Sequence, residues 1–273
     1  AINGTCMGGA TELSLACHGR VASNAKSVKI GLPEVKVGIF PGAGGTQRVA
    51  RLANTQDALQ MMTTGQTLTA ARAKAMNLVH QVVEPGELIN AAKQMIKDGL
   101  KPVAPWDEKG FKVPGGGIWT PAAAQLWPAA SAILRRETAG NYPAALAILK
   151  SVYEGLQVPF DTGLRIEQRY FTEIVQTTEA YSMIRSLFVS MQELNKGARR
   201  PAGQPKSEIK KVGVVGAGFM GAGIAYVTAQ AGLEVVLVDR DQEAADKGKA
   251  YSHKLVSDQI MKGRAKTADR DAL

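Results

Sequence analysis

One glycine-rich turn, Gly216-Ala217-Gly218-Phe219-Met220-Gly221, most constrains how this 273-residue chain can fold. An apolar run at 211–215 comes directly before the turn, and an alanine-rich run at 222–231 follows it. A second apolar run, at 234–238, ends at Asp239. Strand, turn, helix and strand in this order predict a β-α-β unit.

The spacing of this unit is typical of a dinucleotide-binding turn. Gly216 permits the tight turn, Gly218 lets the backbone approach a pyrophosphate, and Gly221 lets the helix pack on the strand. The pyrophosphate then sits at the positive end of the helix dipole. Asp239 would accept hydrogen bonds from a ribose and repel a 2′-phosphate, which favours NAD over NADP, although Arg240 beside it weakens that preference. An unrelated α/β unit with a glycine-rich turn is the alternative.

Two acids follow glycine-containing turns near the start of the chain. Glu12 follows Gly8-Gly9-Ala10-Thr11, and Glu34 follows Gly31-Leu32-Pro33. A short helix and two short strands between them could bring both carboxylates to one site, where one takes a proton and the other gives one. Amides of the first turn could stabilise negative charge on a thioester oxygen. Taken alone, each acid could equally be a solvated surface residue.

The chain divides by character into four parts. Residues 1–100 alternate short strands and helices, and 101–195 hold an irregular proline- and glycine-rich connection followed by helices. Residues 196–208 are basic and rich in proline and glycine, which predicts a linker, and 209–273 begin a second unit. The predicted strands in the first two parts are 20–22, 27–30 and 78–83. The predicted helices are 9–18, 46–52, 55–63, 69–76, 87–97, 122–137, 143–156 and 161–195, the last broken near 177.

Composition excludes several classes of protein. The hydrophobic content of 45% and charged content of 21% are those of a globular protein. No apolar run reaches the roughly 18 residues of a membrane span and no signal peptide opens the sequence, so we expect no membrane span. Cys6 and Cys17 are too few for a disulfide framework and are typical of thiols in a reducing cytosol, so we expect a cytoplasmic location. The net charge of +9 is compatible with a phosphate-bearing small molecule such as coenzyme A, and no basic motif indicates nucleic acid. Two cysteines without ligand spacing predict no metal site.

Three segments carry a family resemblance. Ala1-Ile2-Asn3-Gly4 through Leu13, together with 31–34 and 41–46, closely resembles the enoyl-CoA hydratase (crotonase) family. The unit from 209 resembles the NAD-binding domain of 3-hydroxyacyl-CoA dehydrogenases, and the order of the two is similar to that in bacterial multifunctional fatty-acid oxidation enzymes. The resemblance implies an α/β fold with a partial crotonase-like ββα spiral, a helical linker region and a partial Rossmann NAD-binding domain.

The resemblance also implies roles for individual residues. Glu12 would help hold and activate a water, Glu34 would exchange the proton at the α carbon, and the N–H of Gly9 would form half of the oxyanion hole. The implied NAD contacts are Gly216, Gly218, Met220, Gly221 and Asp239. Ala10 stands where a third glycine is often found, a small change that preserves the turn.

The function implied is fatty-acid β-oxidation by a lyase and an oxidoreductase on one chain. The enzyme would hydrate trans-2-enoyl-CoA to 3-hydroxyacyl-CoA and oxidise this to 3-oxoacyl-CoA with NAD. An enoyl-CoA isomerase, or another crotonase-type enzyme fused to a dehydrogenase, is the alternative, although the presence of both Glu12 and Glu34 favours hydration. Acyl-CoA thioesters are the expected substrates, and a thiolase subunit or a second copy of the chain are candidate partners.

The resemblance further implies that this chain is an internal fragment. Segments before Ala1 would supply the first strands, much of the coenzyme A site and the second oxyanion N–H. Segments after Leu273 would supply the rest of the Rossmann sheet and the catalytic histidine and glutamate of the dehydrogenase. A catalytically inactive scaffold is therefore a further alternative for this chain by itself.

Overall fold

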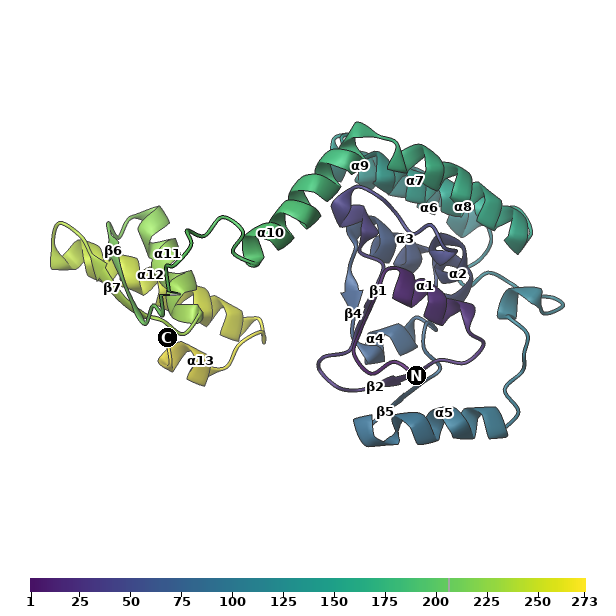
Figure 1. Ribbon diagram of the computed structural model, residues 1–273, viewed down its shortest axis with the longest axis horizontal. Helices are drawn as coiled ribbons and strands as arrows, with labels where there is room; N and C mark the ends of the chain where they lie inside the picture. The colour runs from purple at the N-terminus through teal and green to yellow at the C-terminus, as the bar shows by residue number, and fades with distance from the viewer. Residues whose placement is uncertain (206) are drawn as a thin grey trace. The chain divides into compact units, whose positions relative to one another are not determined.

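The computed structural model describes residues 1–205 and 207–273 (Figure 1), which form two compact units, Ala1–Arg199 and Arg200–Leu273. The boundary falls inside the basic segment that the sequence indicates as a linker. In the part of the chain that is described, no helix is both long and apolar enough to cross a membrane.

The strands of the larger unit are short and form two small sheets. One sheet has the order β1 (Thr5–Met7), β3 (Lys29–Gly31) and β4 (Thr67–Leu68), and the other pairs β2 (Val21–Ser23) with β5 (Gln81–Val83). β1 runs parallel to β3, with Cys6 opposite Ile30, whereas β4 is antiparallel to β3. β2 and β5 are parallel. The predicted strand at 78–83 is shorter than expected, because the N–H of Leu78 bonds back to the Ala73 carbonyl and its side chain enters the core.

Helices make up most of the larger unit. They are α1 (Gly9–Ala16), α2 (Gly45–Leu52), α3 (Thr55–Thr64), α4 (Ala70–Ala75), α5 (Leu88–Lys97), α6 (Pro121–Thr138), α7 (Pro143–Gly155), α8 (Phe160–Val175), α9 (Thr178–Met183) and α10 (Met191–Asn195), with short helices η1 (Glu34–Val37), η2 (Pro85–Glu87) and η3 (Pro105–Asp107) and the π-helix η4 (Ile184–Ser190). The predicted break near 177 is confirmed, because the Thr177 hydroxyl accepts the Ala180 N–H and starts a new helix. The π-helical turn is not predictable from the spacing of apolar residues.

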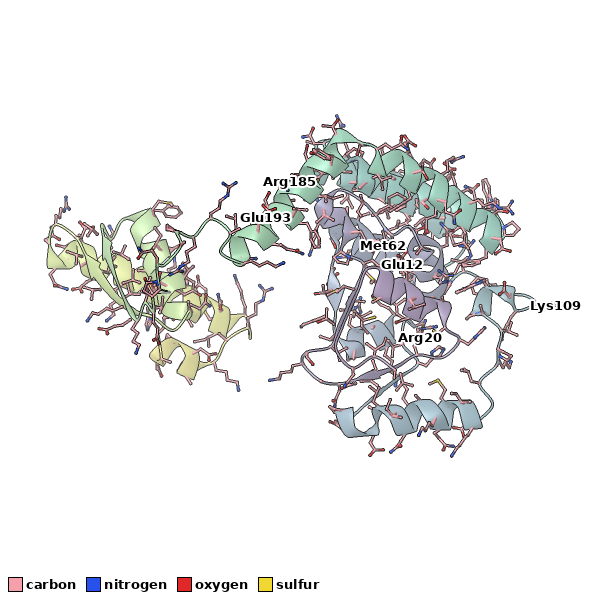
Figure 2. The ribbon with its side chains drawn as sticks, in the orientation of Figure 1. Glu12, Arg20, Met62, Lys109, Arg185 and Glu193 are labelled. Carbon is pink, nitrogen blue, oxygen red and sulfur yellow. The ribbon has the colours of Figure 1, made fainter. Side chains whose placement is uncertain are left out.

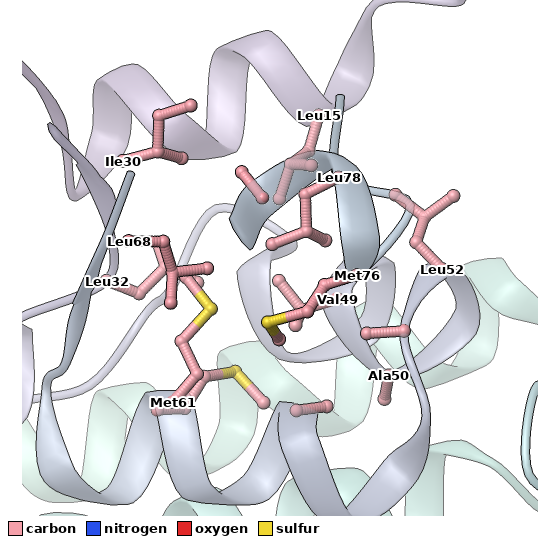
Figure 3. Packing of buried hydrophobic residues seen from close by; sticks show 14 of the residues in the cluster. Leu15, Ile30, Leu32, Val49, Ala50, Leu52, Met61, Leu68, Met76 and Leu78 are labelled. Carbon is pink, nitrogen blue, oxygen red and sulfur yellow. The ribbon is translucent and has the colours of Figure 1, made fainter. Parts of the chain in front are cut away.

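One hydrophobic core joins strands of both sheets to α1, α2, α3, α4, α7 and α8, and Figure 3 shows part of it. Ile30 and Leu68 come from the first sheet and Met61 from α3, and each is at least 98% buried. Ile148 of α7 and Ile174 of α8 belong to the same core. The helices between 121 and 175 therefore complete the core of the preceding segment and do not form a separate layer. Burial of each such aliphatic side chain stabilises the fold by roughly 1.5–3 kcal/mol.

The smaller unit contains the β-α-β element expected from the glycine turn. It consists of β6 (Lys211–Val215), α11 (Phe219–Gln230), β7 (Glu234–Val238), α12 (Gln242–Met261) and α13 (Thr267–Asp271). β6 and β7 are parallel over their full length, with Val215 opposite Val238. Gly248 lets α12 approach the glycine turn, since a Cβ atom there would lie 2.7 Å from the Ala217 carbonyl oxygen.

Candidate active site and dinucleotide site

A glycine turn at the start of α1 forms one wall of the candidate active site. Gly8 has φ 57° and ψ −130°, a conformation that L-residues with a side chain rarely adopt. Gly9 is exposed and opens the helix. Among the described residues, the N–H groups of Gly9, Ala10 and Thr11 have no hydrogen-bond acceptor, as is usual for the first turn of a helix. These amides and the helix dipole make the turn a favourable place for negative charge.

Glu12 lies one turn further along α1, in the interior of the larger unit (Figure 2), and is 4% exposed. Its Oε1 atom accepts hydrogen bonds from the N–H groups of Ala43 and Gly45, both at 2.8 Å. A Cβ atom at Gly45 would lie 2.8 Å from this oxygen, so the close approach requires glycine. The carboxylate of Glu12 therefore joins α1 to the glycine-rich loop that precedes α2.

Glu34 opens η1 and lies against the same glycine turn. A Cβ atom at Gly8 would lie 3.0 Å from Glu34 Oε1, and Glu34 Oε2 is buried without a partner among the described residues. Burial raises the pKa of Glu34 to about 7, the negative charges of Glu12 and Glu167 raise it further, and a backbone hydrogen bond opposes the shift. Of the three residues expected from the sequence, Gly9 and Glu34 thus lie at this turn, and Glu12 lies on the helix that the turn opens, with its charge near enough to act on Glu34.

A third carboxylate, Glu167 of α8, also reaches this region, and the sequence analysis misses it. Glu167 is fully buried and accepts hydrogen bonds from Gly44 N–H at 2.6 Å, Thr46 N–H at 2.9 Å and the Thr46 hydroxyl. Burial raises its pKa to about 7, and hydrogen bonds from Thr46 and Gly44 oppose the shift. Its sequence signal is the placement of an acid on the buried face of α8, between Gly163 and Ile174 at helical spacing.

Polar contacts behind the loop connect α2 to α7. The Thr46 and Ser151 hydroxyl oxygens are 3.1 Å apart, and Gln47 Nε2 donates to the Ser151 carbonyl at 3.0 Å. Arg51 donates to the Gly155 carbonyl at 2.7 Å. Gly155 is required here, because a Cβ atom would lie 2.1 Å from Gln47 Oε1. The loop is therefore held by buried hydrogen bonds on the side away from Glu12.

In the smaller unit, the glycine turn has the geometry of a cradle. Gly216 has φ 98°, and a Cβ atom at Gly221 would lie 1.6 Å from the Gly216 carbonyl oxygen. No atom lies within 4 Å of the Cβ position at Gly218, so this side of the turn is open. Met220 is 71% exposed on α11. The turn therefore leaves room for a pyrophosphate beside the start of the helix.

Asp239 connects the end of β7 to this turn. Its Oδ2 accepts the Ala217 N–H at 2.5 Å and its Oδ1 accepts the Arg240 N–H at 2.7 Å. These two hydrogen bonds, the one from Ala217 first, lower the pKa of Asp239. A hollow of about 500 Å³ adjoins them, lined by Ala217, Gly218, Phe219, Ala222, Asp239, Arg240, Ala244, Lys247, Gly248 and Tyr251. Of the five predicted NAD contacts, Gly218 and Asp239 line this hollow, and Gly216, Met220 and Gly221 do not.

Comparison with known proteins agrees with both parts of the chain. Residues 1–103 match the family described as enoyl-CoA hydratase/isomerase, and residues 211–273 match the NAD-binding domain of 3-hydroxyacyl-CoA dehydrogenase. The chain is thus an α/β protein in which a crotonase-type region precedes a Rossmann-type NAD-binding region. The two matches, in this order on one chain, confirm the resemblance to a fused enoyl-CoA hydratase and 3-hydroxyacyl-CoA dehydrogenase, and they confirm the fold class.

Solved structures of hydratases are similar over most of this chain. A carnitinyl-CoA hydratase from Mycobacterium avium is 24% identical, with a TM-score of 0.44, over 69% of this chain and 58% of that one. An enoyl-CoA hydratase from Bacillus anthracis is 27% identical, with a TM-score of 0.34, over 71% of this chain and 57% of that one. This chain therefore spans less than two thirds of the length of either structure.

Proposed function

We propose that the whole protein hydrates trans-2-enoyl-CoA to 3-hydroxyacyl-CoA and oxidises that product to 3-oxoacyl-CoA with NAD, as in fatty-acid β-oxidation. The family matches of the two parts support this order of reactions on one chain. The observation that carries the hydratase proposal is the placement of Glu12 and Glu34 beside one glycine turn with free helix amides. Acyl-CoA thioesters are the proposed substrates. Assembly with a thiolase subunit or a second copy, and a cytoplasmic location, stay predictions.

In the proposed hydration, the thioester oxygen accepts the N–H of Gly9. A donor of this kind is worth about 2.7–4 kcal/mol to the transition state. Glu12 takes a proton from a water molecule as the water oxygen bonds to C3, and Glu34 gives a proton to C2. Because its pKa is about 7, the carboxyl of Glu34 is substantially protonated at neutral pH. Proton transfer through solvent then restores both carboxyls for the next turnover.

In the proposed oxidation, the smaller unit binds the dinucleotide. The start of α11 takes the pyrophosphate and Asp239 accepts hydrogen bonds from a ribose. When bound, NAD supplies the acceptor for the hydride that leaves C3. The open side of Gly218 and the adjoining hollow fit this group.

The proposed acid role of Glu34 is tested by Glu34→Gln in the whole protein. Loss of a general acid lowers hydration of crotonyl-CoA by about 10²–10⁴-fold, because glutamine cannot give up a proton at C2. The matched control is Glu87→Gln, which removes the same charge from an exposed position of η2. Both variants should retain the far-ultraviolet circular dichroism of the parent. Unchanged hydration by Glu34→Gln would refute the assigned role.

Isomerisation of enoyl-CoA is the second candidate, because Glu34 alone combines a raised pKa with a place beside the free amides. A single acid/base suffices to move a double bond, whereas hydration also requires activation of water. If the whole protein is an isomerase, Glu12→Gln should therefore leave isomerisation of enoyl-CoA in place. If it is a hydratase, the same substitution should abolish hydration. An inactive scaffold is the alternative for the 273-residue chain by itself, and it would be supported if that chain bound NAD and catalysed neither reaction.

A further inference from the structure

The loop at 43–46, whose last two residues are also the first two of α2, donates hydrogen bonds to two carboxylates. The amides at its odd positions donate to Glu12 and those at its even positions donate to Glu167. Successive peptide planes of the loop are therefore held in alternate directions.

We propose that Glu167 is a positioning residue for hydration: by fixing the loop at 43–46 from behind, it holds the two amides that orient Glu12. The catalytic meaning of this inference rests on the proposed hydratase function. Glu167 does not reach the substrate side of the loop, since it is fully buried against α2.

The loop needs such a support because glycine leaves its backbone free to rotate. Gly44 has φ 94°, and Gly42, Gly44 and Gly45 fall within four consecutive residues. Hydrogen bonds to a carboxylate are stronger than those between two neutral groups. Two amides and one hydroxyl bonded to Glu167 can therefore hold this segment in one conformation.

The support itself is rigid. Glu167 lies on α8, where Gly163 allows close packing against α2: a Cβ atom at Gly163 would lie 2.6 Å from Gln47 Oε1. The Thr46 hydroxyl contacts both Glu167 and Ser151, so α7 and α8 hold the same point of the loop. A displacement of the carboxylate of Glu167 is thereby transmitted to the amides that hold Glu12.

The charge of Glu167 also acts on the acid of the proposed reaction. Glu12 and Glu167 are the two charged groups that raise the pKa of Glu34 beyond the effect of burial. Replacement of Glu167 by glutamine removes one of these negative charges, so the pKa of Glu34 falls. Because hydration uses protonated Glu34, the alkaline limb of the pH–rate profile moves to lower pH.

The first test compares Glu167→Gln with Glu154→Gln in the whole protein. Glu154 is a matched control, because this half-exposed acid of α7 accepts hydrogen bonds from Arg169 and Tyr170 and, among the described residues, has none to the loop at 43–46. Glu167→Gln should lower kcat for crotonyl-CoA hydration by about 10- to 100-fold, with KM changed less than about threefold, and should shift the alkaline limb. If Glu167→Gln and Glu154→Gln had the same kcat and the same pH–rate profile, the inference would be wrong.

Glu167→Asp separates geometry from charge. Aspartate keeps the negative charge but withdraws the carboxylate from the loop by one methylene. We expect kcat to fall as in Glu167→Gln, with the alkaline limb left near that of the parent. If Glu167→Asp retained the parent kcat, the position of the carboxylate would not matter and the inference would be wrong.

A second test does not depend on turnover. Amide hydrogen exchange is measured residue by residue on the 273-residue chain and on Glu167→Gln. Exchange at Ala43 and Gly45, which bond to Glu12, should accelerate at least tenfold, whereas Glu154→Gln leaves it unchanged. Unaltered exchange at these two amides would overturn the inference even if hydration fell. If the whole protein lacked hydratase activity, the proposed function would fail, and this exchange would still decide whether Glu167 fixes the loop.

Discussion

Replacement of Gly8 by alanine should damage the candidate active site through the backbone, without removal of any catalytic group. Gly8 combines φ 57° and ψ −130° with a Cβ position 3.0 Å from Glu34 Oε1. Alanine at this position either keeps the strained backbone or displaces the turn and Glu34 with it. The neighbouring Gly9 is helical, with no atom within 4 Å of its Cβ position, and so provides a matched control.

The expected magnitude follows from the strain. A residue with a side chain in a sparsely populated region of φ and ψ costs on the order of 1–3 kcal/mol. In a unit of this size, each kcal/mol lowers Tm by roughly 2–4 °C, so Gly8→Ala should lower Tm by about 2–12 °C. Gly9→Ala should leave stability unchanged or raise it by up to about 1 kcal/mol, because alanine restricts the unfolded chain.

In this chain, tryptophan fluorescence reports the unfolding of the larger unit alone. All three tryptophans, Trp106, Trp119 and Trp127, lie within Ala1–Arg199. Urea unfolding followed by this signal therefore gives the free energy of unfolding of the unit that contains Gly8, without interference from the smaller unit. A Gly8→Ala variant as stable as Gly9→Ala would show that the turn at Gly8 is not constrained as described.

The remaining predictions concern pH and NAD. Burial raises the pKa of Glu34 and Glu167 from 4.5 to about 7 in the folded state, so the folded state binds these two protons more tightly than the unfolded state. The resulting contribution to the free energy of unfolding is fully present below about pH 4.5 and is lost as the pH rises through about 7. Glu167→Gln should reduce the change in the free energy of unfolding between pH 5 and pH 8 by on the order of 3 kcal/mol, as measured by urea unfolding at the two pH values. The same change in parent and variant would contradict this prediction. Asp239→Ala should weaken NAD binding about tenfold or more in titration calorimetry of the whole protein, because a hydrogen bond to a charged acceptor is lost. Asp246→Ala on the exposed side of α12 is the control, and equal affinities would refute the ribose contact.

Local signals in the sequence predict most of the elements near the candidate sites. The expected helices at 46–52 and 55–63 differ from α2 and α3 by a single residue each, because glycine and asparagine mark where they begin. The β-α-β unit is equally local, since strand, turn and helix are consecutive. Gly8 and Glu34 could be associated with one site from their motifs, although only the fold brings them into contact.

Contacts between distant segments could not be predicted in this way. Glu167 is 121 residues from Thr46, and no short-range pattern indicates that an acid on α8 meets the N-terminus of α2. The strands are only two or three residues long in the larger unit, and their pairing depends on which runs the core accepts. Leu78 is an example: it has the composition of a strand residue, but its amide closes the turn after α4.

The close packing of α7 and α8 on α2 has a consequence for how this region can be divided. A polypeptide cut after residue 103, where the hydratase family match ends, would leave Thr46, Gln47 and Arg51 without the partners that satisfy them in the interior. Unpaired buried polar groups cost roughly 1–3 kcal/mol each, comparable in sum to the whole stability of a small domain. Recombination or engineering that transfers the two glutamates to another protein must therefore carry the later helices with them.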